Sequence, residues 1–533
     1  MSPKRRGPVL DAVDLEVYRH RFAAIAEEMG AALQHSAFSP NIKERRDFSC
    51  ALFDEHGDTV AQGDHMPVHL GSMPDSVRAA LADCPPGPGD MILLNDPYRG
   101  GTHLPDLTLV AALWHARRPI LYVASRAHHS DVGGSRPGSM PLAREIFEEG
   151  LRLPPVRIVQ AGQLNDDLLR VLLANVRTPE ERRGDLLAQV AANRTGLKRL
   201  EELCEKEGAG RILMAARELM AYSERRMRAI LRSIPNGTYR ATDTLDPEPG
   251  HPAPVLRVRV RIAGGKAGVD FSGTHAQLGD GRNAVASITR SAVFYVFRCL
   301  AGADLPTNAG AWRPLDIRVP AGSLLDARPP AAVAAGNVET SQRIVDLLLR
   351  ALARALPGRI PAASQGTMNN LTLGGVAADG TPFTYYETMA GGMGARPGAD
   401  GLSGVHTHMT NSLNTPIEAL EHALPVRLRR YGLRRGSGGA GRYRGGDGLV
   451  REIEILADVE CTLLAERRCT PPWGLRGGKN GAPGRDRVQM GPGEKWRTVP
   501  GRVSLRLQKG SVLKIETPGG GGWGRAQKGR RRT

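Results

Sequence analysis

The pattern that most constrains this chain is a pair of apolar runs separated by one short polar turn. The runs span residues 107–114 and 120–124, and the turn spans residues 115–118. Short apolar runs on either side of a polar turn predict two strands of an antiparallel β-hairpin. The loop at residues 95–106 leads into the first strand, and the loop at residues 125–131 follows the second. Both loops must therefore lie at the same end of the hairpin.

These two loops bring imidazole and carboxylate groups to that end, without a thiolate. Asp106 and His128 stand at the strand ends, and His103, His129 and Asp131 lie beside them in the sequence. Such donors suit zinc, manganese or iron(II), and they resemble two-histidine-one-carboxylate sites with open positions. The alternative is a polar cluster of hydrogen-bonded histidines. Because the hairpin joins two histidine–carboxylate groups, we favour a divalent metal site.

A second predicted hairpin, with strands at residues 48–53 and 59–62, carries further polar groups at one end. Glu44 and Asp47 precede its first strand, and His65 and His69 follow its second. We expect these four side chains to gather there. Glu44 or Asp47 could complete a metal site or act as a general base. A salt-bridged loop formed with the neighbouring Lys43, Arg45 and Arg46 is an equally good interpretation.

The remaining hydrophobic patterns predict an α+β, multi-domain chain. Apolar residues at three- and four-residue steps predict a helix over residues 11–36, and similar stripes predict mostly helix over residues 164–232. A helix is also expected over residues 341–356. We expect the following units: an α+β region with the metal-site loops (1–163), a helical region (164–235), a mixed α/β region (236–430), an all-β module (431–524) and a basic tail (525–533).

Composition excludes several function classes. The 533 residues carry a formal net charge of +17, but eight of the basic residues lie in the two tails and aromatic residues are only 5%. A stacking groove for nucleic acid is therefore not expected. No apolar stretch is long enough to span a bilayer, and the N-terminus lacks a secretory pattern, so we expect a cytoplasmic protein. The six cysteines are scattered, which predicts buried thiols rather than disulfides.

The sequence offers no nucleotide-binding loop. Glycine-rich runs at residues 436–441, 445–448 and 519–522 do not match G-x-x-x-x-G-K-[ST], and they are not placed between a strand and a helix. In a β-rich region they predict turns and bulges with positive φ. No G-x-S-x-G nucleophile elbow is present either. His406 and His408 alternate like neighbours on one face of a strand, and they either line a pocket or make structural hydrogen bonds.

Several longer motifs, in order along the chain, resemble those of the hydantoinase B/oxoprolinase family. They are NIKERRDFSC at residues 41–50, NDPYRGGTHLPD at 95–106, AHHSDVGG at 127–134, YRGGDG at 443–448, ERR at 466–468 with PWG at 472–474, and TPGGGG at 517–522. The resemblance extends from about residue 11 to residue 524. It implies the B subunit of an ATP-dependent enzyme that opens a cyclic amide such as hydantoin, N-methylhydantoin, 5-oxoproline or a lactam.

The resemblance also implies a partner and a set of ligands. In this family ATP is bound by a separate A-type subunit, so this chain is expected to be active only within a hetero-oligomer. The family's H-x-x-D motif and later histidine correspond to His103, Asp106 and His128 as ligands of a divalent metal, often manganese. Glu44 would be the fourth ligand, with His129 and Asp131 in support. The alternative is a subunit of an acetone- or acetophenone-type carboxylase, although this chain is shorter than those subunits.

Overall fold

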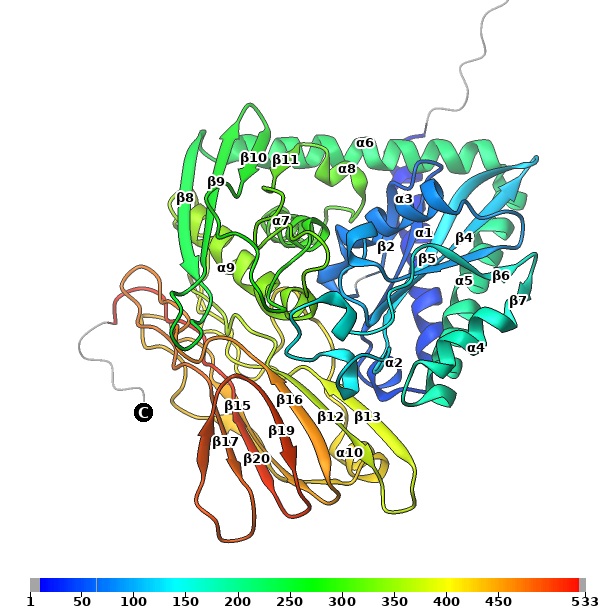
Figure 1. The fold of residues 1–533 in the computed structure, drawn as a ribbon. Helices are drawn as coiled ribbons and strands as arrows, with labels where there is room; N and C mark the ends of the chain where they lie inside the picture. The colour runs from blue at the N-terminus through cyan, green and yellow to red at the C-terminus, as the bar shows by residue number, and fades with distance from the viewer. Residues whose placement is uncertain (1–9, 64, 527–533) are drawn as a thin grey trace, which may run out of the picture.

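The N-terminal part of the chain forms one seven-stranded antiparallel sheet covered by helices on both faces (Figure 1). The computed structural model describes residues 10–63 and 65–526. The sheet has the order β2-β1-β5-β4-β3-β6-β7. Its strands are β1 (Phe48–Phe53), β2 (Thr59–Gln62), β3 (Met91–Leu94), β4 (Asp106–His115), β5 (Arg118–His128), β6 (Val156–Gln160) and β7 (Gln163–Leu164).

The predicted hairpin is confirmed as β4 and β5, which occupy the centre of this sheet. Their register places Asp106, the first residue of β4, directly opposite His128, the last residue of β5. β1 pairs with the other edge of β5, and β3 with the other edge of β4. The loops that precede β4 and follow β5 therefore meet at one end of the sheet, as the sequence predicts.

Long amphipathic helices close one face of this sheet. α1 (Ala12–Ser36) begins at a capping box in which the Asp11 carboxylate accepts the Asp14 N–H at 2.8 Å. Its buried face, which includes Phe22, Ile25 and Met29, packs on α5 (Pro179–Glu207) and on the sheet. α3 (Ser72–Asp83) covers the opposite face. The remaining helices here are α2 (Pro40–Lys43), α4 (Asp166–Ala174) and α6 (Ala209–Ser233), so the helical prediction for residues 164–232 is confirmed for most of its length.

A smaller sheet and three helices follow in the middle of the chain. The sheet has the order β11-β10-β9-β8, with bounds β8 (Gly237–Thr244), β9 (Val255–Ala263), β10 (Lys266–Asp270) and β11 (Leu315–Arg318). Its helices are α7 (Ala286–Ala301), α8 (Ala309–Trp312) and α9 (Ser341–Leu352). α9 starts where predicted, but it ends four residues early. A π-helical turn, η5 (Gly336–Thr340), leads directly into it.

The C-terminal part consists of two sheets that pack face to face around a separate apolar core. One sheet has the order β13-β12-β16-β19, and the other has the order β14-β15-β20-β17-β18. The strands are β12 (Asn370–Val376), β13 (Pro382–Glu387), β14 (Val426–Arg434), β15 (Gly448–Ile455), β16 (Val459–Leu464), β17 (Arg485–Gln489), β18 (Arg497–Val499), β19 (Arg502–Leu507) and β20 (Val512–Glu516), with α10 (Ile417–Ala423) between β13 and β14. Since β12 pairs with β16, the sheets continue across the expected boundary at residue 431.

The glycine-rich runs have a different role from the one expected. Of the glycines in the three runs, Gly436 has a positive φ, whereas Gly445 and Gly520 do not. A Cβ atom on Gly445 would lie 1.9 Å from the Gly520 carbonyl oxygen, and one on Gly520 would lie 2.1 Å from the Met393 carbonyl oxygen. These runs therefore pack backbone against backbone, with hydrogen bonds such as Gly520 N–H to Gly446 O at 2.9 Å. Glycine is required at Gly445 and Gly520 because two backbone segments approach each other closely, and not because of turn geometry.

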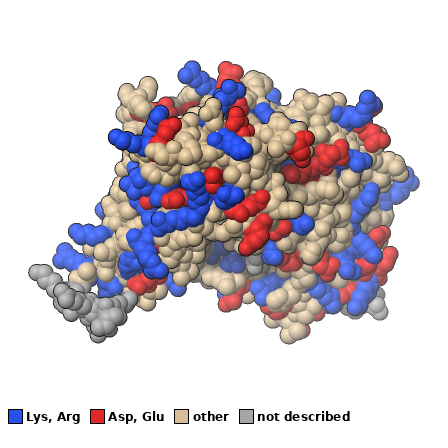
Figure 2. Space-filling view, turned by 90° about the horizontal axis from the view of Figure 1, so that it is seen from below, with Lys and Arg blue, Asp and Glu red and all other residues tan. Residues whose placement is uncertain are grey.

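The structure also bears on the predictions about surface charge and buried cysteines. Basic and acidic side chains are interspersed over the face shown in Figure 2. The basic residues 4–6, 528 and 530–532 lie outside the described part of the chain. Among the described residues, no helix combines the length and apolarity needed to cross a bilayer. Cys50, Cys84 and Cys461 are buried as expected, but Cys299 and Cys469 are exposed and Cys204 is half-buried.

Candidate metal centre

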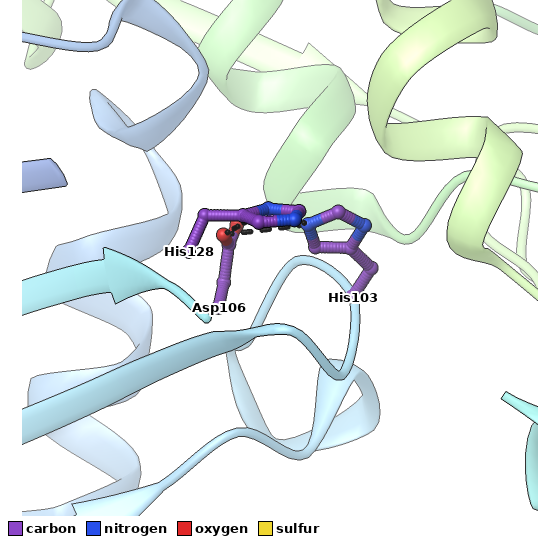
Figure 3. Close-up of side chains that lie close together, drawn as sticks. All are labelled: His103, Asp106 and His128. Atoms are coloured by element: carbon purple, nitrogen blue, oxygen red, sulfur yellow. Dashed lines mark hydrogen bonds and ion pairs between the residues drawn. The ribbon is translucent and has the colours of Figure 1, made fainter. Parts of the chain in front are cut away.

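Three side chains converge at the end of the β4–β5 hairpin (Figure 3). His103 comes from the loop before β4, Asp106 from the first position of β4, and His128 from the last position of β5. His103 Nε2 and His128 Nδ1 are 3.2 Å apart, and each lies 3.3 Å from Asp106 Oδ1. All three residues are buried. The hairpin thus brings together the three residues expected from the sequence as metal ligands.

The spacing of these atoms fits a metal ion. Bonds of about 2.1 Å to a common ion would separate neighbouring ligands by about 3.0 Å in octahedral geometry and about 3.4 Å in tetrahedral geometry. The observed separations of 3.2–3.3 Å lie between these values. Two imidazole nitrogens and one carboxylate oxygen also form a donor set suited to zinc, manganese or iron(II). The residues present therefore fit a divalent ion.

The electrostatics of the cluster keep the ligands in the forms that bind metal. Burial alone would raise the pKa of Asp106. The electrostatic effect of His103, together with hydrogen bonds from His103, His128 and His69, instead holds the pKa of Asp106 well below its usual range. Burial lowers the pKa of His128 despite the nearby carboxylates of Asp106 and Asp47. At neutral pH the pair therefore presents a carboxylate and a neutral imidazole, as metal coordination requires.

Asp47 and His69, from the first hairpin, also reach the cluster. His69 Nε2 lies 3.4 Å from Asp106 Oδ2, and its Nδ1 lies 2.8 Å from Ser49 Oγ. The Asp47 backbone oxygen accepts the His128 N–H at 3.0 Å. Asp47, His69, Asp106 and His128 line one small cavity of about 10 Å³, room for about one water molecule. Of the four side chains expected at the end of the first hairpin, Asp47 and His69 therefore reach the cavity beside the cluster.

Four other residues that the sequence suggests for this site lie outside the cluster of His103, Asp106 and His128. Glu44 caps the short helix α2 and is partly exposed, outside the cluster of three ligands. His65 lies against α1, 3.5 Å from Glu27 Oε2. His129 contacts Gln189 of α5 at 2.9 Å, because successive strand residues alternate between faces. The Asp131 carboxylate accepts hydrogen bonds from Arg177 N–H and from Arg177 Nη1, each about 3.0–3.1 Å long.

Two residues from distant parts of the chain complete the surroundings. Asn337, in the π-helical turn η5, places Nδ2 3.1 Å from His103 Nε2. The Tyr386 ring, from β13, stacks on His128 with 4.3 Å between the ring centroids. A π-helical turn is a frequent feature of functional sites. No local pattern marks either residue, because each is brought in by long-range packing.

The sequence and the fold of this chain are similar to those of known proteins. The family model described as hydantoinase B/oxoprolinase matches residues 11–526. The chain belongs to the hydantoinase B/oxoprolinase family. This match extends from α1 to the end of the described chain and includes every strand of the metal centre.

Members of the hydantoinase B/oxoprolinase family and related folds give further similarities. 5-oxoprolinase 1 of Arabidopsis thaliana is 40% identical over 98% of this chain, which spans only 42% of that protein's length. The crystal structure of an ATP-dependent caprolactamase from Pseudomonas jessenii is 28% identical, with a TM-score of 0.91 over 97% of this chain and 92% of the other. A nucleotide-free acetone carboxylase has the same TM-score over 97% of this chain and 76% of its own, but at 20% identity it shows the shared fold alone.

Proposed function

We propose that this chain is the B subunit of a two-component, ATP-dependent hydrolase of cyclic amides, active with an A-type subunit. The observation that carries the proposal is the buried cluster of His103, Asp106 and His128 beside a cavity that holds about one water molecule. The similarity to a 5-oxoprolinase and to an ATP-dependent caprolactamase supports a five- or seven-membered cyclic amide as the class of substrate.

The cluster supplies the residues for hydrolysis. A divalent ion held by His103, Asp106 and His128 would lower the pKa of a bound water and polarise a carbonyl oxygen. His69 fixes the orientation of the Asp106 carboxylate, and the Asn41 side chain donates a 2.7 Å hydrogen bond to the His128 carbonyl. Met66, Val68, Val338 and Met368 line the same cavity, so apolar side chains separate the reacting atoms from bulk water.

Asp47 is our proposed general base. Burial raises its pKa, although His128 and Arg45 partly oppose the shift. A carboxylate with a raised pKa is a better proton acceptor at neutral pH. The Arg45 guanidinium is itself fixed in place, because it donates hydrogen bonds to Thr388 Oγ1 at 2.6 Å and to Ser412 Oγ at 3.1 Å. Asp47 lines the cavity whereas Glu44 does not, which favours Asp47 over the other carboxylate suggested by the sequence.

Activation of the amide is assigned to a second component. An unactivated amide is a poor electrophile, and ATP would convert its oxygen into a phosphate leaving group. This chain has no phosphate-binding motif. It also matches only 42% of the length of the Arabidopsis 5-oxoprolinase, so that protein contains further sequence without a counterpart here. Both facts support an A-type subunit as the site of ATP binding.

Reconstitution tests the proposal. The chain should be mixed with its A-type subunit, ATP and 5-oxoproline, hydantoin, N-methylhydantoin or caprolactam, and the ring-opened product and ADP should be measured. We expect product only when both components and ATP are present. Ring opening by the isolated chain would contradict the proposal. ATP consumption that requires bicarbonate and a ketone would instead show a carboxylase.

Two matched variants test the general base in the reconstituted enzyme. Asp47→Asn should lower kcat by roughly 100-fold or more, because proton transfer to a positioned base contributes about that much. Glu44→Gln should leave kcat within about threefold of the wild type, since Glu44 lies outside the cavity. The metal content of both variants should be measured alongside. A large loss of activity in Glu44→Gln with normal activity in Asp47→Asn would reverse the assignment.

A further inference from the structure

A second, much larger cavity lies beside the candidate metal centre. Its volume is about 540 Å³, within the range of roughly 300–1,000 Å³ found for small-molecule sites. It lies between α7, α9 and the loops at residues 359–364 and 393–411. Its lining includes Cys299, Arg359, Arg396, His408 and Thr410.

The two cavities are neighbours. Thr410 lines both of them. Pro67 lines the large cavity, and the residues on either side of it, Met66 and Val68, line the small one. A molecule in the large cavity would therefore lie next to the small cavity that Asp47, Asp106 and His128 line.

The lining of the large cavity favours an organic anion. Arg359 and Arg396 line it, and no aspartate or glutamate does so among the described residues. His406 and His408 line it as well, but burial lowers the pKa of His406 to about 3, so the His406 ring is neutral. Arg396 is exposed, and Arg359 donates to the Leu300 carbonyl at 2.6 Å at the end of α7. Apolar side chains form much of the remaining wall: Val296, Leu300, Leu349, Ile360 and Met393. Two arginines in a cavity with an apolar wall suit a negatively charged molecule with an aliphatic body.

His408 is held in this wall by a buried ion-pair chain. Its Nε2 lies 3.3 Å from Asp346 Oδ1, and Asp346 Oδ2 accepts a 2.5 Å hydrogen bond from Arg467. All three residues are buried. His408 also has a φ of +61°, a left-handed conformation that is uncommon for residues other than glycine and that concentrates at functional sites. With Nε2 facing Asp346, Nδ1 is the ring atom left to meet a ligand.

We propose that the large cavity binds the activated, anionic form of the amide and its ring-opened carboxylate, and that His408, held by Asp346, is the proton donor to the leaving nitrogen. Arg359 and Arg396 would bind the phosphate or carboxylate group, and the apolar wall would bind the ring carbons. The cavity itself predicts an organic-anion site. The identity of the anion and the role of His408 rest on the proposed function.

The proton step is balanced within the site. After water adds to the activated carbonyl carbon, the C–N bond of the ring breaks and its electron pair passes to nitrogen, while the phosphate stays on the carbonyl carbon as an acyl phosphate. A second water then cleaves this acyl phosphate, which releases inorganic phosphate and leaves the ring-opened carboxylate. The nitrogen takes a proton from the His408 imidazolium, which becomes neutral imidazole. Asp346 stabilises the imidazolium before transfer and keeps the ring oriented, as a carboxylate does for an acid–base histidine. Asp47 then releases to solvent the proton that it took from water, and His408 takes up a proton from solvent, so both residues return to their starting forms.

Binding to the cavity can be tested on the isolated full-length chain with butyl phosphate and butyrate as probes. Cys299 lines the cavity and is exposed, whereas Cys469 is exposed but does not line it. Either probe should slow alkylation of Cys299 by iodoacetamide and leave Cys469 unchanged, as measured by mass spectrometry. Arg396→Gln should weaken this protection by about tenfold, because it removes a charge-assisted hydrogen bond. Arg430→Gln, an exposed position on β14, is the matched control.

The role of His408 is tested in the reconstituted enzyme. His408→Asn is the chosen variant because asparagine tolerates the left-handed backbone. It should lower kcat by about 100-fold and leave both KM and the probe affinity within about threefold. Arg396→Gln should show the opposite pattern, with a raised KM and little change in kcat. His422→Gln, on the exposed side of α10, should behave as the wild type.

The outcomes separate this inference from the proposed function. Failure of both probes to protect Cys299 in the folded wild type, or equal protection in Arg396→Gln, would overturn the anion site. Normal kcat in a folded His408→Asn would overturn the proton donor. Protection of Cys299 without ring opening by the reconstituted wild type would contradict the proposed function and leave the anion site standing.

Discussion

Asn337, in the π-helical turn η5, contacts one of the three residues expected as metal ligands. Its Nδ2 lies 3.1 Å from His103 Nε2, and its buried Oδ1 has no hydrogen-bond partner. A half-turn of the amide would exchange the two atoms and place an oxygen donor at the cluster. We therefore expect Asn337 to be a fourth ligand.

Asn337→Ala should weaken Mn²⁺ or Zn²⁺ binding by roughly 10- to 100-fold, the range typical of partners that support a metal site. Isothermal titration of the metal-free chain measures this. Asn175→Ala, an exposed asparagine after α4, should bind metal as the wild type does. Unchanged affinity in Asn337→Ala would exclude it as a ligand.

At the same scale, the residues that the sequence identifies are those whose positions follow from local hairpins. His103, Asp106 and His128 meet because an antiparallel turn fixes which strand ends are adjacent. Glu44 is only three residues from Asp47, yet α2 and the turn after it leave Glu44 partly exposed while Asp47 is buried. Asn337 and Tyr386 could not be predicted, since their contacts with the cluster depend on packing between distant segments.

Among the elements, the end of β5 is coupled to α5 through His129. Its Nε2 contacts Gln189 Oε1, and the Gln189 amide donates to the carbonyl groups of Leu107 and Ser125. Burial lowers the pKa of His129 from 6.5 to about 4. Because the unfolded chain takes up this proton below about pH 6.5 and the folded chain does not, the stability from neutral His129 is lost as pH falls from 6.5 to 4.

His129→Gln should reduce this acid sensitivity. At pH 5, protonation in the unfolded state alone costs the wild type about 2 kcal/mol relative to pH 7. Urea unfolding at both pH values should show a smaller difference for His129→Gln by about that amount. His115→Gln, at the exposed turn of the same hairpin, is the control. Equal pH dependence in wild type and His129→Gln would contradict this account of the hairpin end.

Element predictions succeeded where the pattern was local. The strands at residues 48–53 and 59–62 were predicted with the bounds observed, because one short turn separates an apolar run from its return strand. The pairing of β12 with β16 joins residues on either side of the expected boundary at 431. Strand periodicity cannot indicate such a partner, because it reports burial on a face rather than the neighbouring strand.

For the whole molecule, the net charge of +17 gives a prediction about nucleic acid. Residues 1–7 and 525–533 contain eight basic residues and no acidic residue, so their removal leaves a formal net charge of +9. The trimmed chain should fold and bind metal normally, and it should lose most of any weak DNA binding seen at low salt. Fluorescence anisotropy across a salt series measures this. Strong, sequence-dependent binding by the trimmed chain at physiological salt would show a nucleic-acid function.

The metal content of the purified chain is the most direct test of the account. Elemental analysis should find close to one equivalent of a divalent metal in the wild type. His128→Ala and Asp106→Ala should lose most of it, and His129→Gln, whose side chain lies on the opposite face of the strand end, should retain it. Full metal retention in both His128→Ala and Asp106→Ala would contradict the site.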